Sequence, residues 1–290
     1  MKISVVMTSY NYAEYISEAI ESVINQTYTD WELVIVDDGS KDDSLEIIKK
    51  YQKSDKRIKL FQHKNGKNKG LAASLKLGIE KAESDWIAFL ESDDCFHLNS
   101  LEEKVRVIEE LNPDLLFTDV NLFQDRERIN YMSKHLQEIQ DNYTVMNESG
   151  FIDDFSTIIR EANIIPTFSV VILKKTNIAK CDFSSPFKAS LDYFLWNQFQ
   201  NSRVYYLHKK LTNWRMHKDS YINQDKHSWI SRYIFHTRLY YFTIQNKSLL
   251  KRIFLILDYM RKRIIYLRVN KQSIKLNLFS EKFIFEKSWK

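Results

Sequence analysis

Carboxylates gather in a short segment that directly follows an apolar run. Glu91, Asp93 and Asp94 come after Trp86–Leu90. Mg²⁺ and Mn²⁺ bind carboxylate oxygens in proteins, usually one or two of them together with phosphate oxygens of a substrate. The segment therefore suits a clamp for a metal and a diphosphate. A solvated turn is the alternative, because Asp and Ser are ordinary turn residues.

A second acidic pair ends another apolar run. Asp37 and Asp38 follow Trp31–Val36 and precede Gly39 and Ser40. A carboxylate at the end of a strand could accept the imide N–H of uracil or a ribose hydroxyl. The same residues also fit a turn in which Ser40, with Asp43 three residues later, caps the next helix.

The first 120 residues alternate between short apolar runs and segments with helical periodicity. The expected strands are Ile3–Met7, Trp31–Val36, Arg57–Gln62, Trp86–Leu90 and Asp114–Asp119, and the expected helices are Tyr12–Gln26, a segment carrying Leu45, Ile48 and Tyr51, Leu71–Ala82 and Ser100–Leu111, the last opened by a capping box. Strands separated by helices predict crossover units and a mainly parallel sheet. Ligands of such sheets bind beyond the carboxyl ends of the strands, where the acids and the segment Thr8–Asn11 fall.

The pattern loosens after Asp119. Residues 121–150 predict a loop or short helices, Thr167–Lys174 a strand, Leu191–Phe199 a helix, and the chain from Trp229 onward further helices.

Composition excludes several classes of protein. The chain has 290 residues, 44% of them hydrophobic and 14% aromatic, with a net charge of +5, so it can fold around a sizeable core and is not intrinsically disordered. Two cysteines cannot form a disulfide framework. The first apolar run is too short for a secretory signal, and no run reaches the ~18 residues of a membrane span. We expect a cytoplasmic protein.

Three blocks, in order and at matching separations, carry a family resemblance. They are SVVMTSYNYAEYISEAIESVINQTYTDWELVIVDDGSKDDS at residues 4–44, Asn68–Ala72, and WIAFLESDD at residues 86–94. The sequence resembles the family 2 glycosyltransferases, which have a GT-A fold with a Rossmann-like, mixed and mainly parallel sheet flanked by helices. The resemblance implies a nucleotide-sugar-binding half at residues 1–112 and an acceptor-binding half at residues 113–225. A basic helical extension would follow at residues 226–290.

The resemblance also implies roles for the residues at the carboxyl ends of the first two expected strands, Thr8, Tyr10, Asp37 and Asp38, which we call the nucleotide edge. Thr8 and Tyr10 would border the nucleoside base, and Asp38, with Asp37 beside it, would bind the base. Asp93 would face the ribose.

The remaining roles concern the metal and the chemistry. Asp94 would ligate Mn²⁺ or Mg²⁺, and Asp192, in SLDYFLW, would be the general base. Glu91 stands where many relatives have Asp, and Leu191 where they have Glu. In isolation, Asp192 also fits a helix-terminal acid favoured by the macrodipole.

A later segment resembles the family's Arg-x-His sequence. It makes Arg215, His217 and Lys218 candidates for contact with the diphosphate or the acceptor, with a surface loop as the alternative.

The carboxyl-terminal part is basic, with 15 Lys and Arg against 3 Asp and Glu in residues 226–290. Residues 247–275 place apolar side chains at helical spacing among basic ones. Such a helix fits an anionic membrane surface, although packing on the core and binding of nucleic acid give similar patterns. We favour the membrane and expect no nucleic-acid partner.

Together these features predict an inverting, metal-dependent transferase. It would move a sugar from a nucleotide donor, such as a UDP-hexose, to a hydroxyl of a bacterial surface glycan such as capsule or lipopolysaccharide. The acceptor would be a glycan or a lipid-linked oligosaccharide, reached from the cytoplasmic face of the membrane. A catalytically inactive nucleotide-sugar-binding scaffold is the alternative, and an adaptor that acts through its basic tail is another.

Overall fold

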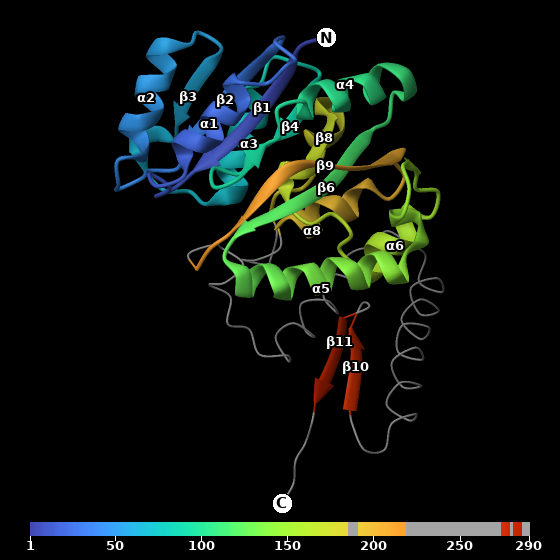
Figure 1. The fold of residues 1–290 in the computed structure, drawn as a ribbon. Coiled ribbons are helices and arrows are strands. Elements are labelled where there is room, and N and C mark those ends of the chain that lie inside the picture. Colours follow the sequence, from blue (N-terminus) through green and yellow to red (C-terminus); the bar gives the residue numbers. More distant parts are fainter. Residues whose placement is uncertain (185–190, 219–273, 279–280, 286–290) are drawn as a thin grey trace, which may run out of the picture.

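A computed structural model describes residues 1–184 and 191–218, together with the backbone of two later strands. One nine-stranded sheet runs through the first two ranges (Figure 1). Its strands are β1 (Ile3–Ser9), β2 (Trp31–Asp37), β3 (Ile58–Gln62), β4 (Trp86–Phe89), β5 (Cys95–Phe96), β6 (Leu115–Gln124), β7 (Gly150–Phe151), β8 (Val171–Lys174) and β9 (Val204–Met216).

The helices flank this sheet. They are α1 (Ile16–Ile24), α2 (Ser44–Ser54), α3 (Leu71–Lys81), α4 (Ser100–Leu111), α5 (Arg126–Asn142), α6 (Phe155–Glu161), α7 (Lys175–Ile178) and α8 (Leu191–Trp196), with 3-10 turns η1 (Lys64–Gly66), η2 (Thr144–Met146), η3 (Phe168–Val170) and η4 (Asn197–Phe199).

The strand order is β3-β2-β1-β4-β8-β6-β9-β5, with β7 beside β9. The strands β3, β2, β1 and β4 are parallel to one another, as their helical crossovers require. Beyond β4 the sheet is mixed: β8 is antiparallel to β4 and β6, and β9 is parallel to β6. The parallel edge predicted from the sequence therefore belongs to the first half of the chain.

Two cores cover the two faces of the sheet. Successive residues of a strand point to opposite faces, so Val5 and Met7 join the core under α1, α2 and α4, whereas Val6 joins the core under α3, α6 and α8. Burial on both faces explains why the strands read as continuous apolar runs instead of alternating ones.

Helix α5 corrects the prediction for residues 121–150. It is a 17-residue helix, and Asp125 caps it by accepting the N–H of Arg128. Ile129, Met132 and Leu136 pack against the core, but the other faces are polar, so the periodic signal was weak.

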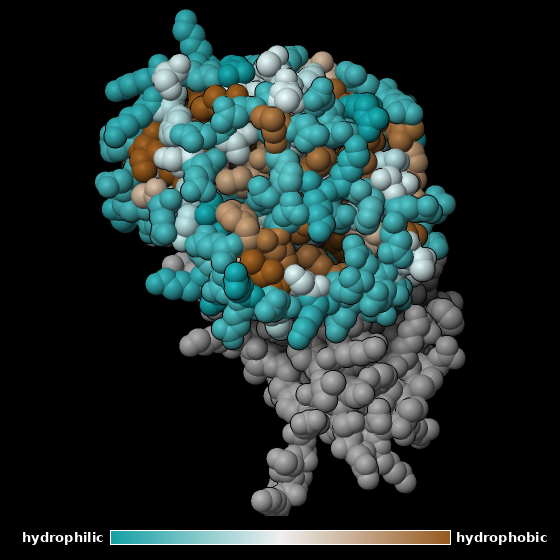
Figure 2. All heavy atoms as spheres, viewed as in Figure 1, coloured by the Kyte–Doolittle hydropathy of each residue, from teal (hydrophilic) through white to brown (hydrophobic). Residues whose placement is uncertain are grey.

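In the view of Figure 1, a hollow with apolar atoms at its base lies between β6, β9 and α5 (Figure 2).

The two predicted caps were wrong. α2 begins at Ser44, and the hydroxyl of Ser40 accepts the N–H of Asn11 instead. Ser100 is the first residue of α4, and its hydroxyl is buried with no partner among the described residues. The predicted strand Thr167–Lys174 also divides, into η3 and β8.

The structure describes little of the predicted extension. β10 (Ile274–Leu278) and β11 (Glu281–Phe285) form an antiparallel pair that was not predicted. Apart from its last two residues, the predicted basic helix 247–275 lies outside the described residues. Within the described part of the chain, no helix has both the length and the apolar character needed to cross a bilayer.

Candidate active site

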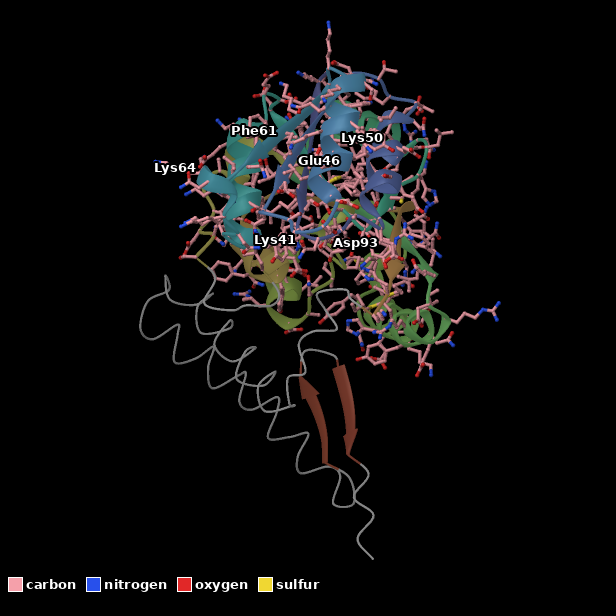
Figure 3. The ribbon with its side chains drawn as sticks, turned by 90° about the vertical axis from the view of Figure 1, so that its left-hand side faces the viewer. Lys41, Glu46, Lys50, Phe61, Lys64 and Asp93 are labelled. Carbon is pink, nitrogen blue, oxygen red and sulfur yellow. The ribbon has the colours of Figure 1, made fainter. Side chains whose placement is uncertain are left out.

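The carboxyl ends of β1, β2 and β4 meet at one edge of the sheet. β1 and β2 are in register from Ile3 with Trp31 to Ser9 with Asp37, and the N–H of Asp38 donates to the carbonyl of Ser9 at 2.8 Å. Lys41, beyond β2, and Asp93, beyond β4, lie along the same lower edge of this half of the molecule in Figure 3. The edge predicted to collect the polar residues is therefore formed.

Asp38 organises the loop between β3 and α3. Its buried carboxylate accepts the backbone N–H groups of Lys69 at 2.7 Å and Gly70 at 2.8 Å, and the imidazole of His63 lies 3.5 Å away. Gly39, the next residue, has φ +80°, and a Cβ there would lie 2.5 Å from the carbonyl oxygen of Gly66. The turn after β2 and the loop at 63–70 are thus fitted to each other.

Asp37 is directed into the protein. Its Oδ1 accepts the N–H of Gly39 at 3.2 Å and the side-chain amide of Gln62 at 3.0 Å. Its Oδ2 is buried and has no hydrogen-bond partner in the described part of the chain. Of the predicted base-binding residues, Thr8 is partly buried and Tyr10 is 43% exposed at the end of β1.

Glu91, Asp93 and Asp94 form what we call the acidic tip, at the end of β4. The hydroxyl of Thr167 donates to Glu91 Oε2, and the N–H of Glu91 donates to the hydroxyl of Ser169 at 2.9 Å. Burial, with the charge of Asp93, raises the pKa of Glu91 to about 8. The side chain of Glu91, one methylene longer than the Asp of many relatives, is therefore held by Thr167, which precedes η3.

Asp94 and Asp93 differ in their surroundings. Asp94 is 1% exposed, and each of its oxygens accepts a hydrogen bond, Oδ2 from the hydroxyl of Ser169 at 2.6 Å and Oδ1 from the N–H of Arg215 at 3.0 Å. Asp93 is more exposed, and its Oδ2 lies 2.9 Å from His217 Nε2. Asp94 is thus built into the protein, whereas Asp93 and His217 form a pair at the tip.

The three candidates from the Arg-x-His segment separate in the structure. His217 is 3% exposed, bonded to Asp93 and packed 4.7 Å from the ring of Tyr15. Arg215 is also buried, and its guanidinium donates to groups of the protein, among them the carbonyl of Asp93. Lys218 is exposed.

Asp192 lies in the first turn of α8. Its Oδ2 accepts the side-chain amide of Asn163 at 3.1 Å, and burial raises the pKa of its carboxyl. Its negative charge also contributes to the raised pKa of Glu91, so the two carboxyls share one electrostatic environment. Leu191, at the position of the family's glutamate, is buried in the core.

Sequence reasoning missed the residues that hold the acidic tip from outside. Thr167 and Ser169 were assigned to a strand, and Asn163 had no signal at all. The sequence gives Tyr12 no role beyond the start of an expected helix, yet its pKa is raised by burial and by Asp93, Glu91 and Asp94, which places its hydroxyl near the tip. Thr167 and Ser169, on either side of Phe168 in a mostly apolar stretch, are the signal in the sequence that could have indicated polar contacts here.

The residues present fit a divalent cation that a substrate helps to bind. Among residues 1–184 and 191–218, no three His, Cys, Asp or Glu side chains form a cation site by themselves. Asp93 and His217 nevertheless supply an oxygen and a nitrogen side by side. Since Mg²⁺ and Mn²⁺ at phosphate-transfer sites typically use one or two carboxylates and take further oxygens from the phosphates, this pair suits a site completed by a diphosphate.

A family model decides the classification. Residues 4–167 match the model of glycosyl transferase family 2. The chain belongs to this family. A protein of Rickettsia bellii described as an uncharacterized glycosyltransferase is 41% identical over 138 residues, which cover 48% of this chain and 19% of that protein. The putative teichuronic acid biosynthesis glycosyltransferase TuaG of Bacillus subtilis is 34% identical over 120 residues, 41% of this chain and 47% of TuaG.

Solved structures confirm the predicted GT-A fold of this family 2 member. S. aureus TarS 1-349, in complex with UDP-GlcNAc, superposes with a TM-score of 0.65 at 19% identity, over 93% of this chain and 77% of that one. The mannosyltransferase PcManGT of Pyrobaculum calidifontis, in complex with GDP-Man and Mn²⁺, gives 0.57 at 12% identity, over 93% and 76%. The chain spans only about a fifth of the length of the Rickettsia relative.

Proposed function

We propose that this family 2 chain transfers a sugar from a UDP-sugar to a hydroxyl of a bacterial surface glycan, with inversion. One observation carries the proposal: Asp93, which pairs with His217, and Asp192 both raise the pKa of Glu91, so the acidic tip and Asp192 belong to one electrostatic site. TarS in complex with UDP-GlcNAc supports the uridine nucleotide, and TuaG supports a polysaccharide product.

In this mechanism the donor lies along the edge formed by β1, β2 and β4. Thr8 and Tyr10 border the base, and Asp37 and Asp38 fix the backbone turn that meets it. Backbone groups held in this way form a preorganised surface, which lowers the ordering cost of binding.

We assign the contact with the divalent cation to Asp93 rather than Asp94. Both carboxylate oxygens of Asp94 accept hydrogen bonds, from Ser169 and Arg215, whereas Asp93 is paired at the tip with His217. When bound, Mn²⁺ or Mg²⁺ would neutralise charge that develops on the departing diphosphate; the Mn²⁺ in PcManGT supports a metal here.

Asp192 acts as the general base. It takes the proton of the acceptor hydroxyl as that oxygen forms a bond to the anomeric carbon, and the bond from this carbon to the phosphate oxygen breaks. A raised pKa suits the task, because a base works best when its pKa is near the operating pH. Asn163 orients the carboxylate through its 3.1 Å hydrogen bond.

The test is release of UDP from a panel of UDP-sugars in the presence of Mn²⁺, with candidate glycan acceptors. Asp93→Asn is expected to abolish release and Asp94→Asn to affect mainly stability. Asp182→Asn is the control, because Asp182 is an exposed acid away from the acidic tip that accepts hydrogen bonds from Ser184. Binding of UDP without turnover of any donor would favour the inactive scaffold, and no binding of UDP would refute the proposal.

The basic segment 247–275 supplies the proposed membrane contact. Each Lys or Arg near an anionic leaflet contributes on the order of 1 kcal/mol. Sedimentation with vesicles that contain anionic lipid should therefore retain the full chain at low salt and lose it at high salt. Retention on neutral vesicles to the same extent would contradict an electrostatic contact.

A further inference from the structure

Arg215 is a buried cation at the centre of the acidic tip. It lies near the end of β9, opposite Phe123 of β6, and is 6% exposed. Its guanidinium carbon lies 4.5 Å from the centre of the Phe123 ring and 4.9 Å from that of Tyr15. A guanidinium between two rings is held by cation–π attraction and cannot swing toward a ligand without losing both contacts.

The hydrogen bonds of this guanidinium all go to the protein. Nε donates to the backbone carbonyl of Asp93 at 2.7 Å, Nη1 donates to Gln124 Oε1 at 2.9 Å, and Nη2 donates to Glu18. Three elements are thereby joined at one side chain: the acidic tip, the end of β6, and α1. The planar fork of an arginine can serve such a set, whereas the ammonium of a lysine cannot reproduce its geometry.

The backbone of Arg215 reaches the same tip. Its N–H donates to Asp94 Oδ1 at 3.0 Å, and two residues later His217 bonds the carboxylate of Asp93. Both aspartates of the tip are thus fixed from the end of β9, one at its carbonyl and the other at its side chain. Glu18 balances the charge of Arg215, so this cation is committed to the protein and is not a phosphate ligand.

We propose that Arg215 is a positioning residue, which sets the direction of the Asp93 carboxylate by holding the carbonyl of that residue and which couples it to α1 through Glu18. This inference rests on the proposed function, in which Asp93 meets the donor and its cation. Groups that orient a metal ligand through a hydrogen bond typically change metal affinity 10–100-fold when they are removed.

The test separates binding of the nucleotide from binding of the cation. Metal-free UDP binding is measured by calorimetry, and Mn²⁺ binding to the UDP-saturated protein by loss of the free Mn²⁺ signal in electron paramagnetic resonance. Arg215→Lys should leave the affinity for metal-free UDP unchanged and weaken Mn²⁺ about 10–100-fold. The spectrum of the bound Mn²⁺ should also change, because the direction of its protein ligand has moved.

The matched control is Arg203→Lys at the other end of β9. Arg203 likewise donates to backbone carbonyls, those of Leu111 and Asn112, and lies 4.7 Å from the ring of Phe151. It should lower the melting temperature without changing Mn²⁺ affinity. If Arg203→Lys weakens Mn²⁺ as much as Arg215→Lys, the effect is one of general stability and the inference fails.

A second pair of variants keeps the inference testable if Arg215→Lys does not fold. Glu18→Gln leaves the arginine in place and removes its charge partner, with Glu14→Gln, an exposed acid just before α1, as the control. A weaker Mn²⁺ affinity in Glu18→Gln alone is expected, and equal affinity in the two variants would overturn the coupling.

The outcomes also separate this inference from the proposed function. A wild-type protein that binds no UDP refutes the function and this inference with it. A wild-type protein that binds UDP and Mn²⁺ normally, together with an Arg215→Lys variant that does the same, refutes only the positioning role. Loss of metal-free UDP binding in Arg215→Lys would mean that Arg215 contacts the nucleotide directly, and this result would also overturn the positioning role.

Discussion

The nucleotide edge and the acidic tip are built in different ways. At the nucleotide edge Asp37 bonds residues two and three positions away and Gln62, 25 positions away, and Asp38 bonds a loop about 30 positions away. The acidic tip is held by Ser169 at a separation of 75 residues from Asp94, by Arg215 at 121 and, on Asp93, by His217 at 124. The edge is a local product of parallel strands, whereas the tip depends on how the second half of the chain packs.

This difference suggests a division of labour. In the proposed mechanism, the first half forms a binding surface from backbone turns, and the second half sets the direction and the charge of the groups that do chemistry. Variants in the two regions should therefore fail in different ways.

The largest effect is expected at Asp192, which belongs to the second half. Asp192→Asn should lower kcat about 10²–10⁴-fold, the usual contribution of a general base, and leave UDP affinity unchanged. Because burial raises the pKa of this carboxyl, the wild-type kcat should begin to fall, as the pH is lowered, at a higher pH than an ordinary aspartate would give. Steady-state kinetics with a pH series check both points. A loss of UDP affinity equal to the loss of kcat would contradict separate roles for the two regions in binding and in chemistry.

Lys104 tests whether stability can change without any change at the site. Its ammonium is fully buried, has no hydrogen-bond partner among the described residues and lies 4.5 Å from the ring of Phe96. Burial lowers its pKa to about 7. Replacing even a buried ion pair by apolar side chains is often neutral or stabilising by about 1–4 kcal/mol, and an ammonium without a carboxylate has no such attraction to offset its desolvation.

We therefore expect Lys104→Met to raise the free energy of unfolding. The unfolded chain binds a proton up to about pH 10.4 and the folded one only up to about 7, so the wild type gains stability as the pH rises between these values. The advantage of the variant should be full below pH 7 and disappear toward pH 10.4. Denaturant unfolding at several pH values measures it, and a gain independent of pH would show that the pKa of Lys104 is the same in the folded and unfolded chains, which would contradict the lowering by burial.

Gly39 tests the local construction of the nucleotide edge. Gly39→Ala places a methyl group against the carbonyl of Gly66 in a left-handed backbone conformation, a strain of about 1–3 kcal/mol. UDP affinity should fall while Mn²⁺ binding to preformed UDP complex stays intact. Gly150→Ala, at a position with open space, is the control, and an equal effect of both variants would contradict a specific fit.

Ser169 gives the smallest expected effect and sharpens the description of the tip. Ser169→Ala leaves Asp94 Oδ2 and the N–H of Glu91 without a partner, which costs about 1–3 kcal/mol of stability. Thermal unfolding should show the loss, and turnover should fall through misplacement of the tip. Ser184→Ala, on an exposed turn, should do neither, and unchanged turnover in Ser169→Ala would show that η3 does not position the tip.

The comparison also explains which predictions were confirmed. Strands β1 to β4 and the helices between them follow from continuous apolar runs and helical spacing, and the family model confirms the resemblance read from the same blocks. In the second half, the sequence predicts an irregular segment where α5 forms, because only one face of this helix is apolar, and a strand where η3 forms, because Phe168 and Val170 flank its one polar residue. Roles assigned by position, such as Asp94 for the metal, stay predictions; we propose Asp93 in its place because both oxygens of Asp94 accept hydrogen bonds from the protein.

The sequence by itself determined the parallel edge and the acids that gather there. Period and spacing are local properties, and parallel strands must bring their carboxyl ends together. Only the tertiary structure decided which acid is buried, which is paired and which groups Arg215 bonds. Those outcomes depend on burial and on hydrogen bonds between residues more than 70 positions apart, and no local pattern in the chain encodes such distances.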